Sequence, residues 1–98
     1  MEKRIGVIAI LVTDTSNISR VNDTLHQYSQ LVLGRQGLPV RDRGISVISL
    51  IVEGDTDDIG ALTGKLGRFP GVQVKSVLTS YKESEHGQDH PGEGRATG

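Results

Sequence analysis

Two stretches of the chain are apolar at nearly every position. Residues 4–12 read RIGVIAILV and residues 45–52 read ISVISLIV, and in both the apolar side chains fall on both alternating faces of an extended backbone. A strand with two apolar faces is covered on both sides in the folded protein. Both stretches are therefore predicted to be strands that pack on each of their faces.

Two other segments carry apolar residues at the three- and four-residue spacing of a helix. Their apolar positions are Ile18, Val21, Leu25 and Tyr28 in the first segment and Ile59, Leu62 and Leu66 in the second. Thr15 or Ser16 is expected to cap the first helix, and Asp55 or Thr56 the second, because their side chains can accept the free N–H groups of a first turn. Gly67 is expected to end the second helix.

Residues 31–40 and 72–79 complete the pattern as two more strands. Pro39 cannot donate a ladder hydrogen bond, so the strand that contains it belongs at a sheet edge. Gly34 and Gly37 in the same strand indicate a bulge or a close backbone approach. The final strand alternates apolar and polar residues, which predicts that one of its faces is exposed.

The elements follow one another as strand, helix, strand, strand, helix, strand. Right-handed crossovers then place the first and third strands side by side in the middle of the sheet. The predicted fold is a ferredoxin-like α+β sandwich, a four-stranded antiparallel sheet with two helices on one face. This domain is expected to span residues 1–79, and the polar, glycine-rich residues 80–98 are expected to form a flexible tail.

Composition narrows the class of protein. The 98 residues suffice for one domain, and a net charge of −1 argues against direct binding of nucleic acid. The chain has no cysteine, which excludes disulfides and thiolate chemistry. It also has no apolar run of membrane-spanning length, and its first residues do not resemble a signal peptide. A cytoplasmic protein without membrane contact is expected.

The apolar character of the two central strands predicts self-association. Two helices can cover one face of a four-stranded sheet, and the other face is then left bare although it too is apolar. A bare apolar face of this kind is typical of an interface. We therefore expect a homo-oligomer, a dimer or a tetramer, that forms through the open face of the sheet.

Arginines and glycines gather around the predicted hairpin turn at residues 41–44. The residues concerned are Arg35, Arg41, Arg43, Gly34 and Gly37. Guanidinium groups and exposed backbone N–H groups could together hold a small anionic ligand such as a carboxylate or phosphate. The alternative is that the arginines form ion pairs with Asp42, Glu53 or a neighbouring subunit.

Three glycines of the second helix, Gly60, Gly64 and Gly67, fall near one helical face. Glycine is costly within a helix, so close packing against another helix or backbone is the favoured explanation, and an anion site is the alternative. His26 is expected at the surface of the first helix. His86 and His90 have metal-ligand spacing, but Gly87 and Pro91 argue against a helix there, and no metal site is predicted.

Three segments resemble one known family. RIGVIAILV, LGRQGLPVRDRGISVISLIV and ALTGKLGRFPGVQVK are together similar to the iron-only hydrogenase system regulators, over residues 2–79. This resemblance implies a small stand-alone regulator, ferredoxin-like and related in fold to ACT domains and to the C-terminal domain of the nickel-responsive repressor. The repressor's metal site uses sheet histidines and a cysteine. The corresponding strand here, GISVISLIV, has no histidine and the chain has no cysteine, so nickel sensing does not carry over.

Together these observations predict a non-enzymatic, oligomeric module that regulates or senses a ligand and uses no cofactor. No nucleophile–base arrangement or acidic pair in an apolar setting suggests catalysis. If the module binds a ligand, the resemblance to ACT domains implies a site at a subunit interface. The expected ligand-binding residues are Arg35, Gly37, Arg41 and Arg43, with Gly64 and Gly67 opposite them. The alternatives are a protein-interaction module without a small ligand and a metal-responsive sensor that uses His26 or the tail.

Overall fold

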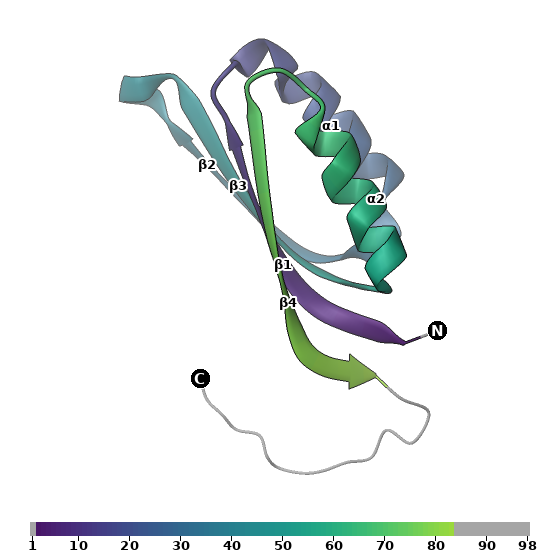
Figure 1. The fold of residues 1–98 in the computed structure, drawn as a ribbon. Helices are drawn as coiled ribbons and strands as arrows, with labels where there is room; N and C mark the ends of the chain where they lie inside the picture. Colours follow the sequence, from purple (N-terminus) through teal and green to yellow (C-terminus); the bar gives the residue numbers. More distant parts are fainter. Residues whose placement is uncertain (1, 84–98) are drawn as a thin grey trace.

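The computed structural model describes residues 2–83 as one antiparallel sheet with two helices on one face (Figure 1). The strands are β1 (Lys3–Val12), β2 (Val32–Val40), β3 (Ile45–Gly54) and β4 (Val72–Glu83), and the helices are α1 (Ile18–Gln27) and α2 (Thr56–Gly67). Three short 3₁₀ turns connect them, at Thr15–Asn17, Ser29–Leu31 and Arg41–Arg43. The element order is the one the sequence predicts, so the ferredoxin-like α+β fold is confirmed.

The strand order is β2-β3-β1-β4, and every neighbouring pair is antiparallel. The two strands that are apolar on both faces, β1 and β3, therefore lie in the middle as predicted. Pro39 lies in β2, which is an edge strand. An edge strand has no partner on its outer side, so the N–H group that proline lacks costs no hydrogen bond there. The sequence signals for strand position are confirmed.

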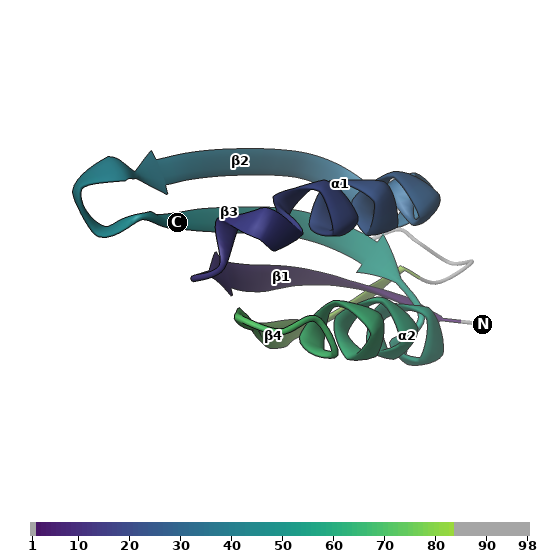
Figure 2. The same cartoon turned by 90° about the horizontal axis from the view of Figure 1, so that it is seen from above.

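The core lies between the sheet and the helix layer. Helix α1 runs over the β2–β3 side of the sheet, and α2 runs over the side of β4 (Figure 2). The fully buried side chains come from both layers: Ile8, Ile10, Val12, Val21, Leu50, Val52, Leu62 and Leu66. All of these fully buried side chains are aliphatic, as expected for a chain with 3% aromatic residues.

The connection from β1 to α1 differs from the prediction. The side chain of Asp14, not that of Thr15 or Ser16, accepts the backbone N–H of Ser16 and so caps the turn that precedes the helix. The Ser16 hydroxyl also donates to the Asp14 carboxylate at 2.6 Å. These two bonds, the hydroxyl bond first, hold the pKa of Asp14 below its ordinary value of 3.8. The buried Asn17 then donates from Nδ2 to the carbonyl oxygen of Pro70.

The ends of α2 and the hairpin turn follow the sequence more closely. The Asp55 carboxylate accepts the backbone N–H of Asp58 at 2.7 Å, so the predicted cap is confirmed, and Gly67 is the last helical residue. The β2–β3 register shifts between Val32 and Gly34, which confirms the bulge. Gly44 closes the hairpin turn with φ of 67°, a left-handed conformation that favours glycine.

Strand β4 is longer than predicted. It continues to Glu83, four residues past the expected end of the domain at residue 79, and its last residues pair with Lys3 and Arg4. The predicted tail therefore overlaps the last part of the strand, and residues 84–98, with His86 and His90, lie outside the described residues. No helix within residues 2–83 is long and apolar enough to cross a membrane.

Candidate functional site

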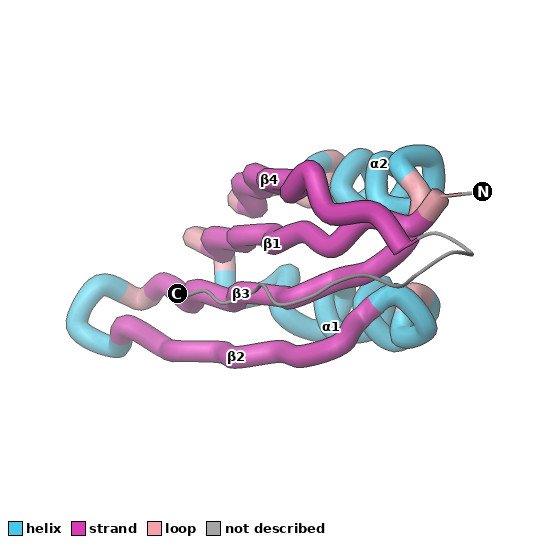
Figure 3. Tube along the Cα trace, turned by 90° about the horizontal axis from the view of Figure 1, so that it is seen from below, coloured by secondary structure: helices cyan, strands magenta, loops and turns pink. Residues whose placement is uncertain are grey.

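Within residues 2–83, no other element covers the sheet face opposite the helices (Figure 3). This open face is apolar. The large apolar side chains that remain exposed include Leu38 (63%), Val7 (41%), Val47 (37%), Ile51 (45%) and Val77 (67%), and they come from all four strands. The register places them on the face away from the helices, since their neighbours in sequence, such as Ile8 and Leu50, fill the core. The sequence predicted an open apolar face, and the structure has one.

The strand register arranges this face in transverse rows. One row runs Gly34, Ile51, Val7, Val77 across β2, β3, β1 and β4, and another runs Leu38, Val47, Leu11, Gln73. Between them lies the row Gln36, Ser49, Ala9, Lys75, whose two central side chains are small. The Ser49–Ala9 row thus lies between two rows that carry large apolar side chains.

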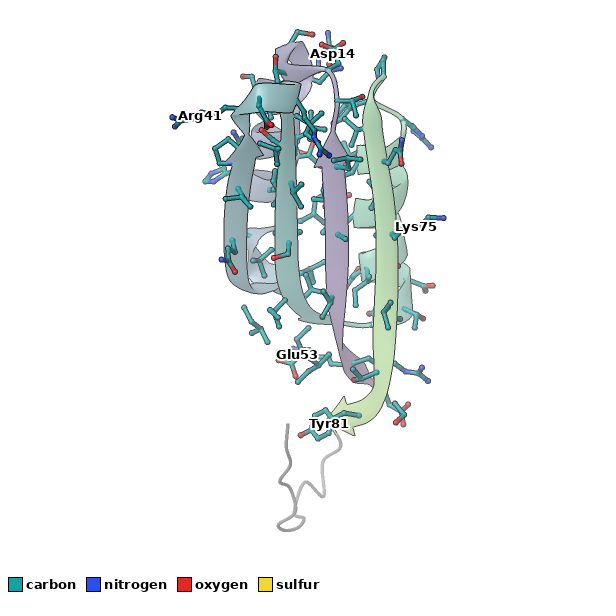
Figure 4. All side chains as sticks on the ribbon, turned by 90° about the vertical axis from the view of Figure 1, so that its left-hand side faces the viewer. Asp14, Arg41, Glu53, Lys75 and Tyr81 are labelled. Atoms are coloured by element: carbon teal, nitrogen blue, oxygen red, sulfur yellow. The ribbon has the colours of Figure 1, made fainter. Side chains whose placement is uncertain are left out.

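Charged groups lie toward the margins of this open face. Lys75 projects from the edge strand β4, and Glu53 lies near the lower end of the sheet (Figure 4). An apolar centre with a polar rim is the usual anatomy of a protein interface. The charges leave the centre of the face, around Val7 and Ile51, free for apolar contact.

A second feature lies on the helix side, at the other surface of the edge strand. A pocket of about 290 Å³ opens between α1 and β2. Its floor is apolar and consists of Leu25, Val32 and Leu50, of which Leu25 and Leu50 are buried core residues. Its rim is polar and consists of Asn22, His26, Ser29 and Arg35.

Arg35 is held in place within this pocket. Its guanidinium donates a hydrogen bond to Oδ1 of Asn22 at 2.5 Å, which joins β2 to α1. That bond goes to a neutral amide, and Arg35 forms no ion pair with any group in residues 2–83. The guanidinium has five N–H donors in a fixed planar arrangement, so donors remain beside the apolar floor.

The other predicted hairpin residues do not join Arg35 in one cluster. Arg41 and Arg43 lie in the exposed turn Arg41–Arg43 at the tip of the hairpin, where Figure 4 shows Arg41 pointing outward. Along an extended strand the six residues from Arg35 to Arg41 span about 20 Å. Gly37 lies between them in β2, and a Cβ added to it would contact nothing within 4 Å.

The glycines of α2 lie near the opposite edge of the sheet. Gly60, Gly64 and Gly67 line a groove of about 630 Å³ together with the first half of β4. A Cβ added at any of them would find no atom within 4 Å. The expected close packing of this helix face is therefore absent within residues 2–83. One subunit does not bring Gly64 and Gly67 next to Arg35, and their meeting across a subunit interface stays a prediction.

Sequence reasoning found Arg35 but missed its partners. Asn22, His26 and Ser29 are ordinary surface residues of a helix and its following turn, and His26 was expected at the surface, with metal sensing as an alternative role only. A helical signal could have indicated them, since residues 22, 26 and 29 are spaced by four and three and so share one face. Among residues 2–83, no three or more His, Cys, Asp or Glu side chains group as metal ligands do.

Within residues 2–83, fold and surface define a small ferredoxin-like domain with an open apolar sheet face and a compact pocket between α1 and β2. The family model described as "TM1266-like: Iron-only hydrogenase system regulator, putative" matches residues 4–76, so the chain belongs to this family. The solved structure of the uncharacterized protein TM1266 from Thermotoga maritima is 42% identical, with a TM-score of 0.75. The match covers 78% of this chain and 96% of that one. The resemblance seen in the sequence is confirmed.

More distant structures share the fold alone. The C-terminal domain of the MgtC protein from Mycobacterium tuberculosis is 16% identical with a TM-score of 0.59, and the match covers 89% of this chain and 94% of that one. An unknown protein from Galdieria sulphuraria is 18% identical with a TM-score of 0.55, over 81% of this chain and 46% of that one. No protein with a curated function matches the chain.

Proposed function

We propose that this protein is a non-enzymatic regulatory module of an iron-only hydrogenase system that works as a homo-oligomer. The observation that carries the proposal is the open sheet face, where Val7, Ile51 and Val77 form one exposed apolar row. Membership of a family named for hydrogenase regulation supports the process. The compact pocket beside Arg35 supports a ligand-responsive role.

A second copy of the chain is the occupant that fits this face best. A two-fold symmetric interface requires a surface that is complementary to itself. The two apolar rows on either side of the Ser49–Ala9 row meet that requirement, because a two-fold axis along the Ser49–Ala9 row sets apolar rows against apolar rows. Small domains also bury a modest share of their surface alone, roughly 60% at this size, so face-to-face assembly stabilises the fold.

Regulation then follows from linkage between assembly and binding. A ligand that binds the assembled protein more tightly than the separate subunits stabilises the assembly by mass action. No chemical step is required of the protein, and the role of its surfaces is to recognise a ligand and a partner. The predicted ligand-binding residues Arg35, Gly37, Arg41 and Arg43, with Gly64 and Gly67, are carried forward as part of this proposal.

Light scattering coupled to size-exclusion chromatography tests the assembly. We expect the natural protein to elute as a dimer or tetramer and Val7→Lys to elute as a monomer, because a lysine there would be buried without a partner. Ala61→Lys is the matched control, since Ala61 is exposed on α2 and the substitution adds the same charge to the helix layer. A natural protein that is monomeric at high concentration contradicts the proposal, as does a Val7→Lys protein that keeps its oligomeric mass.

The hairpin tip favours a second candidate function, docking on a partner protein. Arg41 and Arg43 are exposed in the turn and form no ion pair within residues 2–83. Arginine is enriched in the energetically dominant positions of protein interfaces. If this surface docks on a hydrogenase-maturation protein or a transcription factor, Arg41→Ala with Arg43→Ala abolishes co-purification while the oligomeric mass is unchanged. Co-purification that survives both substitutions excludes this surface.

A further inference from the structure

The pocket between α1 and β2 combines two kinds of surface at a scale that suits a small molecule. Its volume of about 290 Å³ lies near the lower end of the range for ligand pockets, roughly 300 to 1,000 Å³. Leu25 and Leu50 form an apolar floor that belongs to the core. Mostly apolar walls with a few directed polar groups are the usual composition of such sites.

The rim supplies hydrogen-bond donors and one fixed positive charge. Arg35 is the cation, and the amide of Asn22, the ring of His26 and the hydroxyl of Ser29 can each donate as well. No acidic side chain from residues 2–83 lines this pocket. Electrostatics therefore favour an anionic group at the rim.

The hydrogen bond from Arg35 to Asn22 adds to this preference. It fixes one edge of the guanidinium against α1, so the group is already oriented and loses little freedom when a ligand binds. A planar guanidinium and a planar carboxylate fit each other through two parallel N–H···O bonds. A carboxylate is therefore the anion that this rim recognises best.

The apolar floor of the pocket indicates which chemical group the carboxylate is attached to. A bare phosphate would leave the half-buried Val32 and the exposed edge of Leu25 without apolar contact, whereas an aliphatic chain attached to the carboxylate covers them and gains by leaving water. We propose that the α1–β2 pocket binds a small aliphatic monocarboxylate, with its carboxylate on Arg35 and its hydrocarbon part over Val32 and Leu25. This inference rests on the proposed regulatory function, because it names the class of ligand that the module senses.

The pocket and the open face lie on opposite surfaces of β2. Arg35 pairs with Leu50 on the helix side, whereas Leu38 pairs with Val47 on the open side. A molecule bound in the pocket therefore does not compete with a second copy on the open face. Both surfaces share the edge strand, through which binding in the pocket can bias assembly.

The test is a titration of the full chain with 4-methylpentanoate, followed by amide chemical shifts in a two-dimensional NMR spectrum. We expect shifts centred on Asn22, His26 and Arg35 that saturate. Its neutral amide, 4-methylpentanamide, should bind at least about tenfold more weakly, because a charge-assisted hydrogen bond is lost. Acetate and inorganic phosphate, which lack the hydrocarbon part, should also bind more weakly than 4-methylpentanoate.

Substitutions locate the site. Arg35→Gln should weaken 4-methylpentanoate about tenfold or more, and Arg35→Lys should restore part of the affinity because it keeps the charge without the planar arrangement. Arg68→Gln is the matched control, an exposed arginine after α2 that does not line this pocket. It should leave the affinity unchanged. Thermal midpoints without ligand confirm that each variant is folded.

Each contrary result overturns the inference in its own way. If the neutral amide binds as tightly as 4-methylpentanoate, the charge of the ligand does not contribute to binding. If phosphate binds as tightly as 4-methylpentanoate, the apolar floor does not contribute. Unchanged affinity in Arg35→Gln, or no saturable shifts at the pocket, excludes the site. Light scattering on the same samples measures the oligomeric mass separately. A failure of the pocket proposal therefore does not decide whether the protein is a homo-oligomer.

Discussion

A hydrogen bond between Asn17 and Pro70 joins the start of α1 to the loop that follows α2. The side chain of Asn17, only 5% exposed at the start of α1, donates from Nδ2 to the carbonyl oxygen of Pro70 at 2.5 Å, across 53 residues of sequence. Beside it, the backbone N–H of Thr13 donates to the carbonyl oxygen of Gly71 at 2.7 Å. The loop after β1 is thereby fixed to the loop before β4.

Asn17→Ala is expected to lower the free energy of unfolding by about 1 to 3 kcal/mol, because it removes a part-buried hydrogen bond and leaves the Pro70 carbonyl without that donor. Urea unfolding followed by circular dichroism measures the change. Ser19→Ala is the control, since Ser19 is exposed on the same helix and its side chain forms no hydrogen bond within residues 2–83, and it should cost less than about 0.5 kcal/mol. Equal effects of the two substitutions would show that the Asn17–Pro70 bond contributes nothing.

Gly6→Ala is expected to destabilise the protein by about 1 to 3 kcal/mol, as overpacking does. An added Cβ would lie 2.5 Å from Cδ2 of Leu78 and 2.8 Å from the carbonyl oxygen of Val77, so β4 would have to move. The thermal midpoint should fall, and amide exchange in β4 should rise. A midpoint equal to that of the natural protein contradicts the close approach of β1 and β4.

Gly64→Ala is expected to stabilise the protein, in contrast to Gly6→Ala. Nothing lies within 4 Å of the added methyl group, so the gain in helix propensity, about 0.5 to 1 kcal/mol, should raise the stability. Ala61→Gly, at another exposed position of α2, is the reverse control and should lower the stability by a similar amount. If Gly64→Ala instead lowers the oligomeric mass, the glycine face is an interface between subunits.

Asp14 is expected to contribute to the pH dependence of stability. Its pKa is lowered in the folded protein, chiefly by the Ser16 hydroxyl and next by the Ser16 N–H. The folded state therefore binds this proton less readily than the unfolded state. The stabilisation is present above the ordinary pKa of 3.8 and is lost as the pH falls through the lower pKa of the folded protein.

Asp14→Asn tests this pH dependence by thermal unfolding at a series of pH values. The midpoint of the variant should lie below that of the natural protein near neutral pH, and the two should converge in acid, below about pH 4. Asp23→Asn, an exposed substitution on α1, is the charge-matched control. A difference for Asp14→Asn that stays constant down to the most acidic pH would contradict a role for the charged carboxylate.

The sequence predicted the topology because burial leaves a periodic pattern. The two-sided apolar strands and Pro39 were enough to place β1 and β3 in the centre and β2 at an edge. The end of β4 was not predictable in the same way. Residues 80–83 are mostly polar, and Lys82 and Glu83 pair with Arg4 and Lys3 through the backbone, which leaves no hydrophobic signal.

The candidate site was predicted only in part, for a geometric reason. Neighbours in sequence suggested one arginine cluster, but the extended strand carries Arg35 and Arg41 far apart and directs Arg35 toward α1. The contact between Arg35 and Asn22 depends on how α1 crosses the sheet, which no local pattern records. The cap at Asp14 was missed because Thr15 and Ser16 beside it are equally suitable by residue type.

The sheet edges bear on how large any assembly of this protein can become. An unguarded edge strand can add further strands without limit and so leads to fibres. Here β2 carries Pro39 and a bulge, and β4 carries Lys75, features that discourage pairing along the edges. The helices cover the other face. Two copies that stack their bare faces leave no further bare face to stack on, so growth by stacking ends at a finite particle rather than a filament.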